Sequence, residues 1–94
     1  MASAIYITSG TTAATGADFT LQASTSRLFY CKPALGSNES LTLDIKNVDG
    51  TYTQVGTLAN AGNQAGTVTA TGAGTSTFRV SRSTVSPAKT VYFD

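Results

Sequence analysis

The chain has 94 residues, of which 12% are charged, and it contains no His, no Trp and a single Cys. Because His serves most proton transfers near neutral pH, and zinc sites use His or several Cys, this composition argues against catalysis and against a metal site. The net charge of +1, without a cluster of Lys and Arg, also argues against nucleic-acid binding. We therefore predict one domain, residues 1–94, that is not an enzyme, binds no cofactor and has a structural or binding role.

The sequence predicts neither a membrane span nor a signal peptide. It has no run of about 18 apolar residues, and its N-terminus has no positively charged region followed by an apolar one. The lone Cys31 cannot form an internal disulfide, which favours synthesis in a reducing cytosol. Its apolar neighbours predict a small buried side chain rather than a nucleophile.

Alternation of apolar and polar residues with a period of two predicts the first strands. In residues 5–8, Ile5 and Ile7 share one face while Tyr6 points to the other. Residues 19–23 alternate in the same way. Both segments are therefore expected to be half-buried strands.

Residues 27–32 are expected to form a different kind of strand. Four apolar residues follow one another here, so both faces of the strand carry them. This pattern favours a strand that is central in its sheet or lies at an interface. Pro33 ends the strand, because proline has no backbone N–H to donate.

The clearest hairpin is predicted between residues 41 and 58. Its first half alternates Leu, Leu and Ile with polar residues, which is typical of a strand with one buried face. Asp49 and Gly50 supply the backbone conformation that a tight turn needs. Gly56 is expected to mark a β-bulge in the returning strand.

The last third of the chain predicts a loop and three more strands. Residues 60–66 contain no anchor and are expected to form a mobile or surface-draped loop, and residues 67–71 a short strand. Gly72-Ala73-Gly74 is expected to turn the chain into a strand at 75–82, and residues 89–93 form the last strand. The prediction is an all-β domain of about eight short strands, folded as one small antiparallel β-sandwich or a jelly-roll-like barrel.

Four aromatic residues and one arginine are the candidate interface residues. If aliphatic side chains fill the core, Tyr6 and Tyr92 point away from it, and Tyr and Arg are enriched where proteins bind one another. The candidate set is Tyr6, Phe29, Tyr52, Arg79 and Tyr92. The alternative, that neighbouring strands bury these aromatic rings, stays open at this stage.

Three stretches of the chain carry a family resemblance. They are the start Met1-Ala2-Ser3-Ala4-Ile5-Tyr6, the hairpin from Ser40 to Tyr52, and Thr77-Phe78-Arg79-Val80 followed by Val91-Tyr92-Phe93. In these stretches the chain resembles the small β-sandwich structural proteins of tailed bacteriophages, most closely the capsid decoration (cement) proteins.

The resemblance implies a mechanical role. The protein would bind the major capsid protein on the outer surface of the head, bridge neighbouring coat subunits and stabilise the shell. It would be made in the host cytoplasm and reside in the virion, as a homo-oligomer for which a trimer is favoured.

Three other functions remain as alternatives. The first is a tail or baseplate accessory domain of a virion. The second is a carbohydrate-binding β-sandwich module, which needs an exposed aromatic platform and is weakened by the absence of Trp. The third is an oligonucleotide-binding barrel, for which the charge pattern gives no support.

Overall fold

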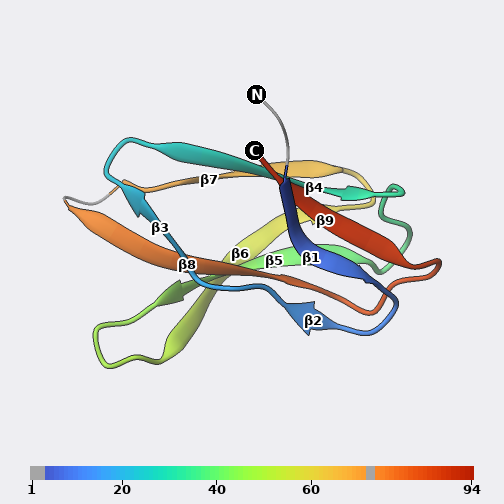
Figure 1. The fold of residues 1–94 in the computed structure, drawn as a ribbon, viewed down its shortest axis with the longest axis horizontal. Coiled ribbons are helices and arrows are strands. Elements are labelled where there is room, and N and C mark those ends of the chain that lie inside the picture. Colours follow the sequence, from blue (N-terminus) through green and yellow to red (C-terminus); the bar gives the residue numbers. More distant parts are fainter. Residues whose placement is uncertain (1–3, 72–73) are drawn as a thin grey trace.

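The computed structural model describes residues 4–71 and 74–94, and every regular element in these ranges is a β-strand (Figure 1). The nine strands of the described residues are β1 (Ala4–Gly10), β2 (Ala14–Thr15), β3 (Phe19–Gln22), β4 (Ser26–Lys32), β5 (Ser40–Lys46), β6 (Tyr52–Asn60), β7 (Ala65–Thr69), β8 (Thr75–Arg82) and β9 (Lys89–Phe93). The expected all-β class is confirmed.

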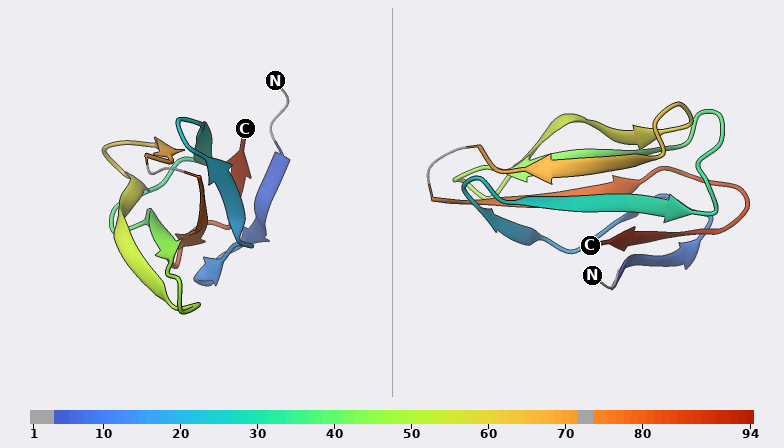
Figure 2. Two further views of the ribbon diagram at one scale, coloured as in Figure 1. Left: turned by 90° about the vertical axis from the view of Figure 1, so that its left-hand side faces the viewer. Right: turned by 90° about the horizontal axis from the view of Figure 1, so that it is seen from above.

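The strands form two antiparallel sheets that pack face to face (Figures 1 and 2). Sheet A has the strand order β1-β9-β4-β7, and sheet B has the order β2-β8-β5-β6, with β3 also paired to β8. The right panel of Figure 2 shows the strands of sheet A side by side in front of sheet B. Neither sheet closes on itself within the described residues, so the structure agrees with the β-sandwich and not with the barrel.

The core lies between the two sheets and is built from the inward-facing residues of each strand. The alternation predicted for the first strand of the hairpin and for residues 75–82 is confirmed, since Leu41 and Val80 are fully buried and Phe78 is 6% exposed. The buried apolar residues are Ile7, Leu21, Phe29, Cys31, Leu35, Leu41, Ala59, Val68, Ala70, Phe78, Val80, Val85 and Val91.

Strand β4 is central in sheet A, between β9 and β7, as the consecutive apolar residues predicted. Its inward residues are Phe29 and Cys31, and its outward residues include Leu28 and Tyr30. Cys31 is buried, as expected, and burial raises the pKa of its thiol. The thiol is therefore a packing group in the sheet.

The hairpin forms as predicted, but its turn is wider than the two residues Asp49 and Gly50. Lys46 pairs with Tyr52, so the loop spans residues 47–51. Gly50 does adopt the positive φ of +89° that favours glycine. The Asp49 carboxylate accepts hydrogen bonds from the backbone N–H and the hydroxyl of Thr51, which orders the turn.

Strand β6 contains two bulges. The pairing register with β5 shifts at Val55 and again at Leu58. The bulge predicted at Gly56 is thus present one residue earlier, and the second was not predicted.

The loop between β6 and β7 has an anchor that the sequence analysis did not find. The side-chain amide of Gln64 donates to the carbonyls of Leu35 and Ala61 and accepts from the Leu35 N–H, so the prediction of an unanchored loop at 60–66 is wrong. Strand β2, which has two residues, was also missed. Residues 72–73 of the predicted turn lie outside the described residues.

Candidate functional site

The structure does not gather the five candidate interface residues at one place. Tyr6 and Phe29 belong to an aromatic cluster between the sheets. Tyr52 and Arg79 meet on the outer face of sheet B. Tyr92 lies on the outer face of sheet A, next to Tyr30. The set therefore separates into core residues and two different surfaces.

The expectation that Tyr6 points away from the core is wrong, and a β-bulge is the reason. Ile5 pairs with Tyr92 and Ile7 pairs with Val91, so Tyr6 is an extra residue in β1. A bulge breaks the alternation of faces, which turns Tyr6 inward while Ile5 remains 58% exposed. The Tyr6 ring contacts three others edge-on, at centroid distances of 5.9, 5.1 and 5.4 Å from Phe19, Phe29 and Phe93. Phe29 is 0% exposed and has no surface to offer a partner.

The Tyr6 hydroxyl connects the two sheets. It donates to the Ala17 carbonyl and accepts the backbone N–H of Val80 at 3.0 Å. Strand β2 pairs with one part of β8 and β3 with another, and Val80 lies between these two parts. The Tyr6 hydroxyl therefore takes the place of a backbone acceptor where β8 has no strand partner on this side. The ring rests on Gly16, where a Cβ would lie 2.1 Å from Tyr6 Cε2. Burial raises the pKa of the Tyr6 hydroxyl, so it remains a protonated donor.

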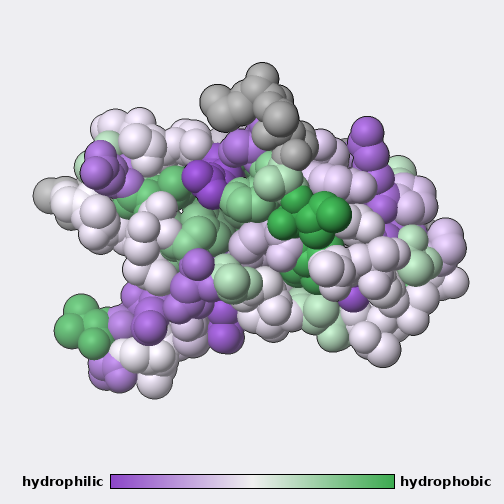
Figure 3. Space-filling view, viewed as in Figure 1, coloured by the Kyte–Doolittle hydropathy of each residue, from purple (hydrophilic) through white to green (hydrophobic). Residues whose placement is uncertain are grey.

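An apolar row crosses the outer face of sheet A. In register, Ile5 on β1 pairs with Tyr92 on β9, Tyr92 pairs with Tyr30 on β4, and Tyr30 pairs with Ala65 on β7. We call these four residues the sheet A row. Figure 3 shows hydrophobic side chains gathered over β1, where the row begins. The row is the surface on which the predicted interface residue Tyr92 lies.

The two tyrosines of the sheet A row stack on each other. Their ring centroids are 5.4 Å apart with an interplanar angle of 20°, and the Lys32 ammonium lies 5.7 Å from the Tyr30 ring centroid. Each ring turns one face toward its neighbour, so both side chains are held in one orientation. Little rotamer freedom is left to lose on binding.

A charged cluster occupies the outer face of sheet B. The Tyr52 hydroxyl donates to both carboxylate oxygens of Asp18, and the Lys46 ammonium lies 3.6 Å from the same carboxylate. The Arg79 guanidinium lies over the Tyr52 ring, 3.5 Å from its centroid. The Arg79 Nε also donates to Asp44 at 3.0 Å.

The sheet B cluster is self-neutralising. Its two carboxylates face two cations, and Asp18 raises the pKa of the Tyr52 hydroxyl by accepting its hydrogen bond. A binding partner would have to compete with these internal contacts, whereas the sheet A row presents apolar and aromatic area, with Ile5 58% exposed. The sheet A row is therefore the better candidate for an interface.

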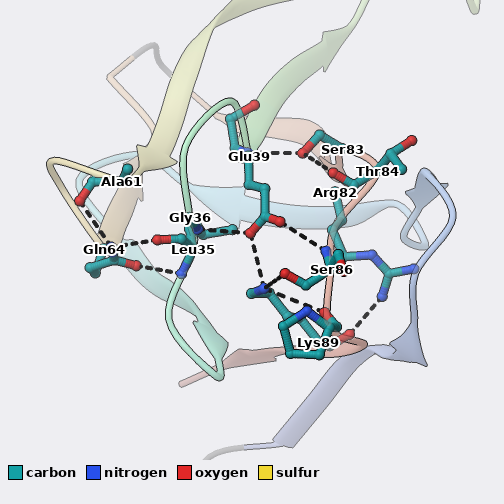
Figure 4. A network of polar contacts seen from close by, with 12 residues as sticks. Leu35, Gly36, Glu39, Ala61, Gln64, Arg82, Ser83, Thr84, Ser86 and Lys89 are labelled. Carbon is teal, nitrogen blue, oxygen red and sulfur yellow. Dashed lines mark hydrogen bonds and ion pairs between the residues drawn. The ribbon is translucent and has the colours of Figure 1, made fainter.

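A buried ion pair lies at one end of the sandwich (Figure 4). The Lys89 ammonium is 3.0 Å from Glu39, and their side chains are 2% and 11% exposed. The Glu39 carboxylate also accepts the backbone N–H groups of Gly36 and Ser86. These two backbone bonds and then the Lys89 contact lower the pKa of Glu39 to about 2.

Arg82 is the second buried cation of this region. Its two terminal nitrogens donate to the carbonyls of Thr8, Lys89 and Thr12. Its Nε is buried without a hydrogen-bond partner among the described residues. Arg82 thus connects β1, β8 and β9 through backbone groups.

Sequence reasoning missed this network. Arg82 and Lys89 stand at strand ends, where charged residues are usually solvated. The one available signal was their position in the alternation. Arg82 lies two residues after Val80 and therefore on the inward face of β8, and Lys89 lies two residues before Val91 and therefore on the inward face of β9.

Residues 4–71 and 74–94 contain no group of three or more His, Cys, Asp or Glu able to hold a metal ion, and no pocket is found in this part of the chain. Nor does this part contain a helix that could cross a membrane. Comparison with protein-family models, with curated proteins and with solved structures finds no match.

Proposed function

We propose that this chain is a non-enzymatic structural protein that attaches to a larger protein surface through the sheet A row. The observation that carries the proposal is the in-register row of Ile5, Tyr92, Tyr30 and Ala65 on an outer sheet face. The resemblance to decoration proteins suggests which surface this is: the outside of a tailed-bacteriophage head, with the major capsid protein as partner.

The physical properties of the row suit protein binding. Ile5 is 58% exposed, and the removal of its apolar surface from water would favour association. The stacked tyrosines add aromatic area of the kind that dominates interface energetics. If the chain is an oligomer, as the resemblance implies, the modest contacts that one oligomer makes at the same time combine through effective concentration into firm attachment.

The row is less suited to a carbohydrate. Sugar binding on a sheet uses aromatic rings whose free faces lie flat against the sugar, and here Tyr30 and Tyr92 turn faces toward each other. Of the functions left open by the sequence, attachment to a protein surface therefore has the stronger support.

The test is co-sedimentation with empty heads assembled from the major coat protein encoded in the same genome. We expect the wild-type chain to pellet with the heads in a saturable ratio. Ile5→Ser and Tyr92→Ser, which remove apolar groups from the row, should weaken binding by about tenfold or more. Val48→Ser is the matched control, because Val48 is fully exposed at the hairpin tip, away from the row.

Two results would contradict the proposal. One is a genome that encodes no coat protein, or heads that retain none of the wild-type chain. The other is equal binding by the row variants and the Val48 control. Saturable quenching of tyrosine fluorescence by polysaccharides would favour the sugar-binding module instead.

A further inference from the structure

The charged residues are distributed unevenly over the strands. Within the described residues, every charged residue that lies in a strand belongs to β4, β5, β8 or β9, which are the central strands of the two sheets. The edge strands β1, β2, β3, β6 and β7 contain none. Proteins usually protect open edges with Lys or other charges, because a free row of N–H and C=O groups invites a second strand. This chain has the opposite arrangement.

Strand β6 is the most open of these edges. It lies within the stretch from Thr51 to Phe78, which has no charged residue at all. It pairs with β5 on one side and with no other strand in the sheet order of the described residues, and only its end at Leu58 lies against β7, at Gly66. Residues 53–57 are all exposed, and Val55 is 53% exposed. The left panel of Figure 2 shows β6 at the outer margin of the molecule.

We propose that the free edge of β6 pairs with β6 of a second copy of this chain, antiparallel and about a twofold axis near Val55. The two five-stranded sheets would then join into one continuous sheet across the dimer. This inference is independent of the proposed attachment to a coat lattice, because it uses a different part of the molecule.

The sequence of β6 is compatible with itself in this register. With Val55 opposite Val55, Thr53 faces Thr57, Gln54 faces Gly56 and Tyr52 faces Leu58. Thr–Thr pairs and aromatic–aliphatic pairs stabilise antiparallel neighbours, while like charges opposite each other destabilise them. A twofold axis brings each residue near its own copy, so a strand without charges is what self-pairing requires.

A second copy fits this edge, because a strand without charges meets no like-charge repulsion from its own copy across a twofold axis. The feature that opposes pairing is the bulge at Val55, because bulges bend an edge away from an incoming strand. The decisive test is therefore placed at Val55.

The first experiment is disulfide trapping in the full chain. Because Cys31 is buried, Val55→Cys introduces the reactive surface thiol. Mild oxidation should convert Val55→Cys into a covalent dimer at least about tenfold faster than Val48→Cys, since proximity raises the effective concentration of the two thiols. Val48 is the matched control, because it lies in the same hairpin and is more exposed. Equal trapping rates for the two variants would overturn the proposal.

The second experiment is the solution mass, measured by size exclusion with light scattering over a tenfold range of concentration. We expect a dimer whose dissociation constant rises about tenfold in Val55→Lys, because two ammonium groups then face each other, and not in Val48→Lys. A monomer at every concentration would overturn twofold pairing. So would a trimer unaffected by Val55→Lys, which would agree with the trimer implied by the resemblance. Neither result affects the co-sedimentation test.

Discussion

At the scale of single residues, Tyr6 connects the two sheets. Its ring packs against the aromatic residues of the core, and its hydroxyl accepts the backbone N–H of Val80 on β8. The ring lies directly on Gly16, where a Cβ would prevent so close an approach.

The contact between Tyr6 and Gly16 leads to a stability prediction. In Gly16→Ala, the new Cβ would lie 2.1 Å from Tyr6 Cε2, so the ring must move and its hydrogen bond to Val80 is lost. We expect the free energy of unfolding to fall by about 2–4 kcal/mol, measured by urea denaturation.

The matched control is Gly56→Ala, whose Cβ would meet nothing within 4 Å. It should leave stability unchanged or raise it by up to about 1 kcal/mol, because alanine restricts the unfolded chain. If Gly16→Ala were as stable as Gly56→Ala, the Tyr6 contact would not have the role described.

Glu39 leads to a prediction about acid. Its pKa in the folded protein is about 2, below its usual value of 4.5, so the folded state binds fewer protons in that range. The stabilisation by Glu39 is complete above about pH 4.5 and is lost as the pH falls toward 2. Glu39→Gln should therefore unfold at lower urea than wild type at pH 7, and the difference should disappear near pH 2.

The wild-type protein, measured over the same range of pH, provides the comparison for Glu39→Gln. If the stability of Glu39→Gln depended on pH in the same way as that of wild type, the buried pair with Lys89 would not stabilise the fold.

At the scale of elements, the sequence predicted strands well wherever pairing is regular. Strands β3 and β8 have the inward residues that alternation assigned. Errors occurred where the register shifts, in β1 and β6, and where a side chain orders the backbone, as Gln64 does beside Leu35. Such side-chain contacts join segments that are distant in sequence, so no local sequence pattern predicts them.

The hairpin turn gives a prediction at this scale. The Asn47 side-chain amide donates to the hydroxyls of Thr51 and Thr53, across the turn. Asn47→Ala should lower the free energy of unfolding by about 0.5–1 kcal/mol and speed amide hydrogen exchange at the tip of the hairpin. Val48→Ala, at a fully exposed neighbour, should change stability by less than about 0.5 kcal/mol. Equal effects of the two substitutions would contradict the role given to Asn47.

At the scale of the whole molecule, composition and alternation predicted the fold class but not where the surfaces lie. Strand order decides which residues become neighbours, and alternation is the same in every antiparallel arrangement. Pairing β9 between β1 and β4 is what aligns Ile5, Tyr92 and Tyr30 in one row. The same topology places the charged residues on central strands and leaves the edges uncharged.

The central proposal is attachment through the outer face of sheet A. Its most direct test is a difference map from cryo-electron microscopy of coat heads imaged with and without this protein. We expect added density in which β1, β9 and β4 face the shell, with Tyr92 at the contact. Density in which sheet B or the β6 edge faces the shell, or no added density at saturating protein, would contradict the proposal.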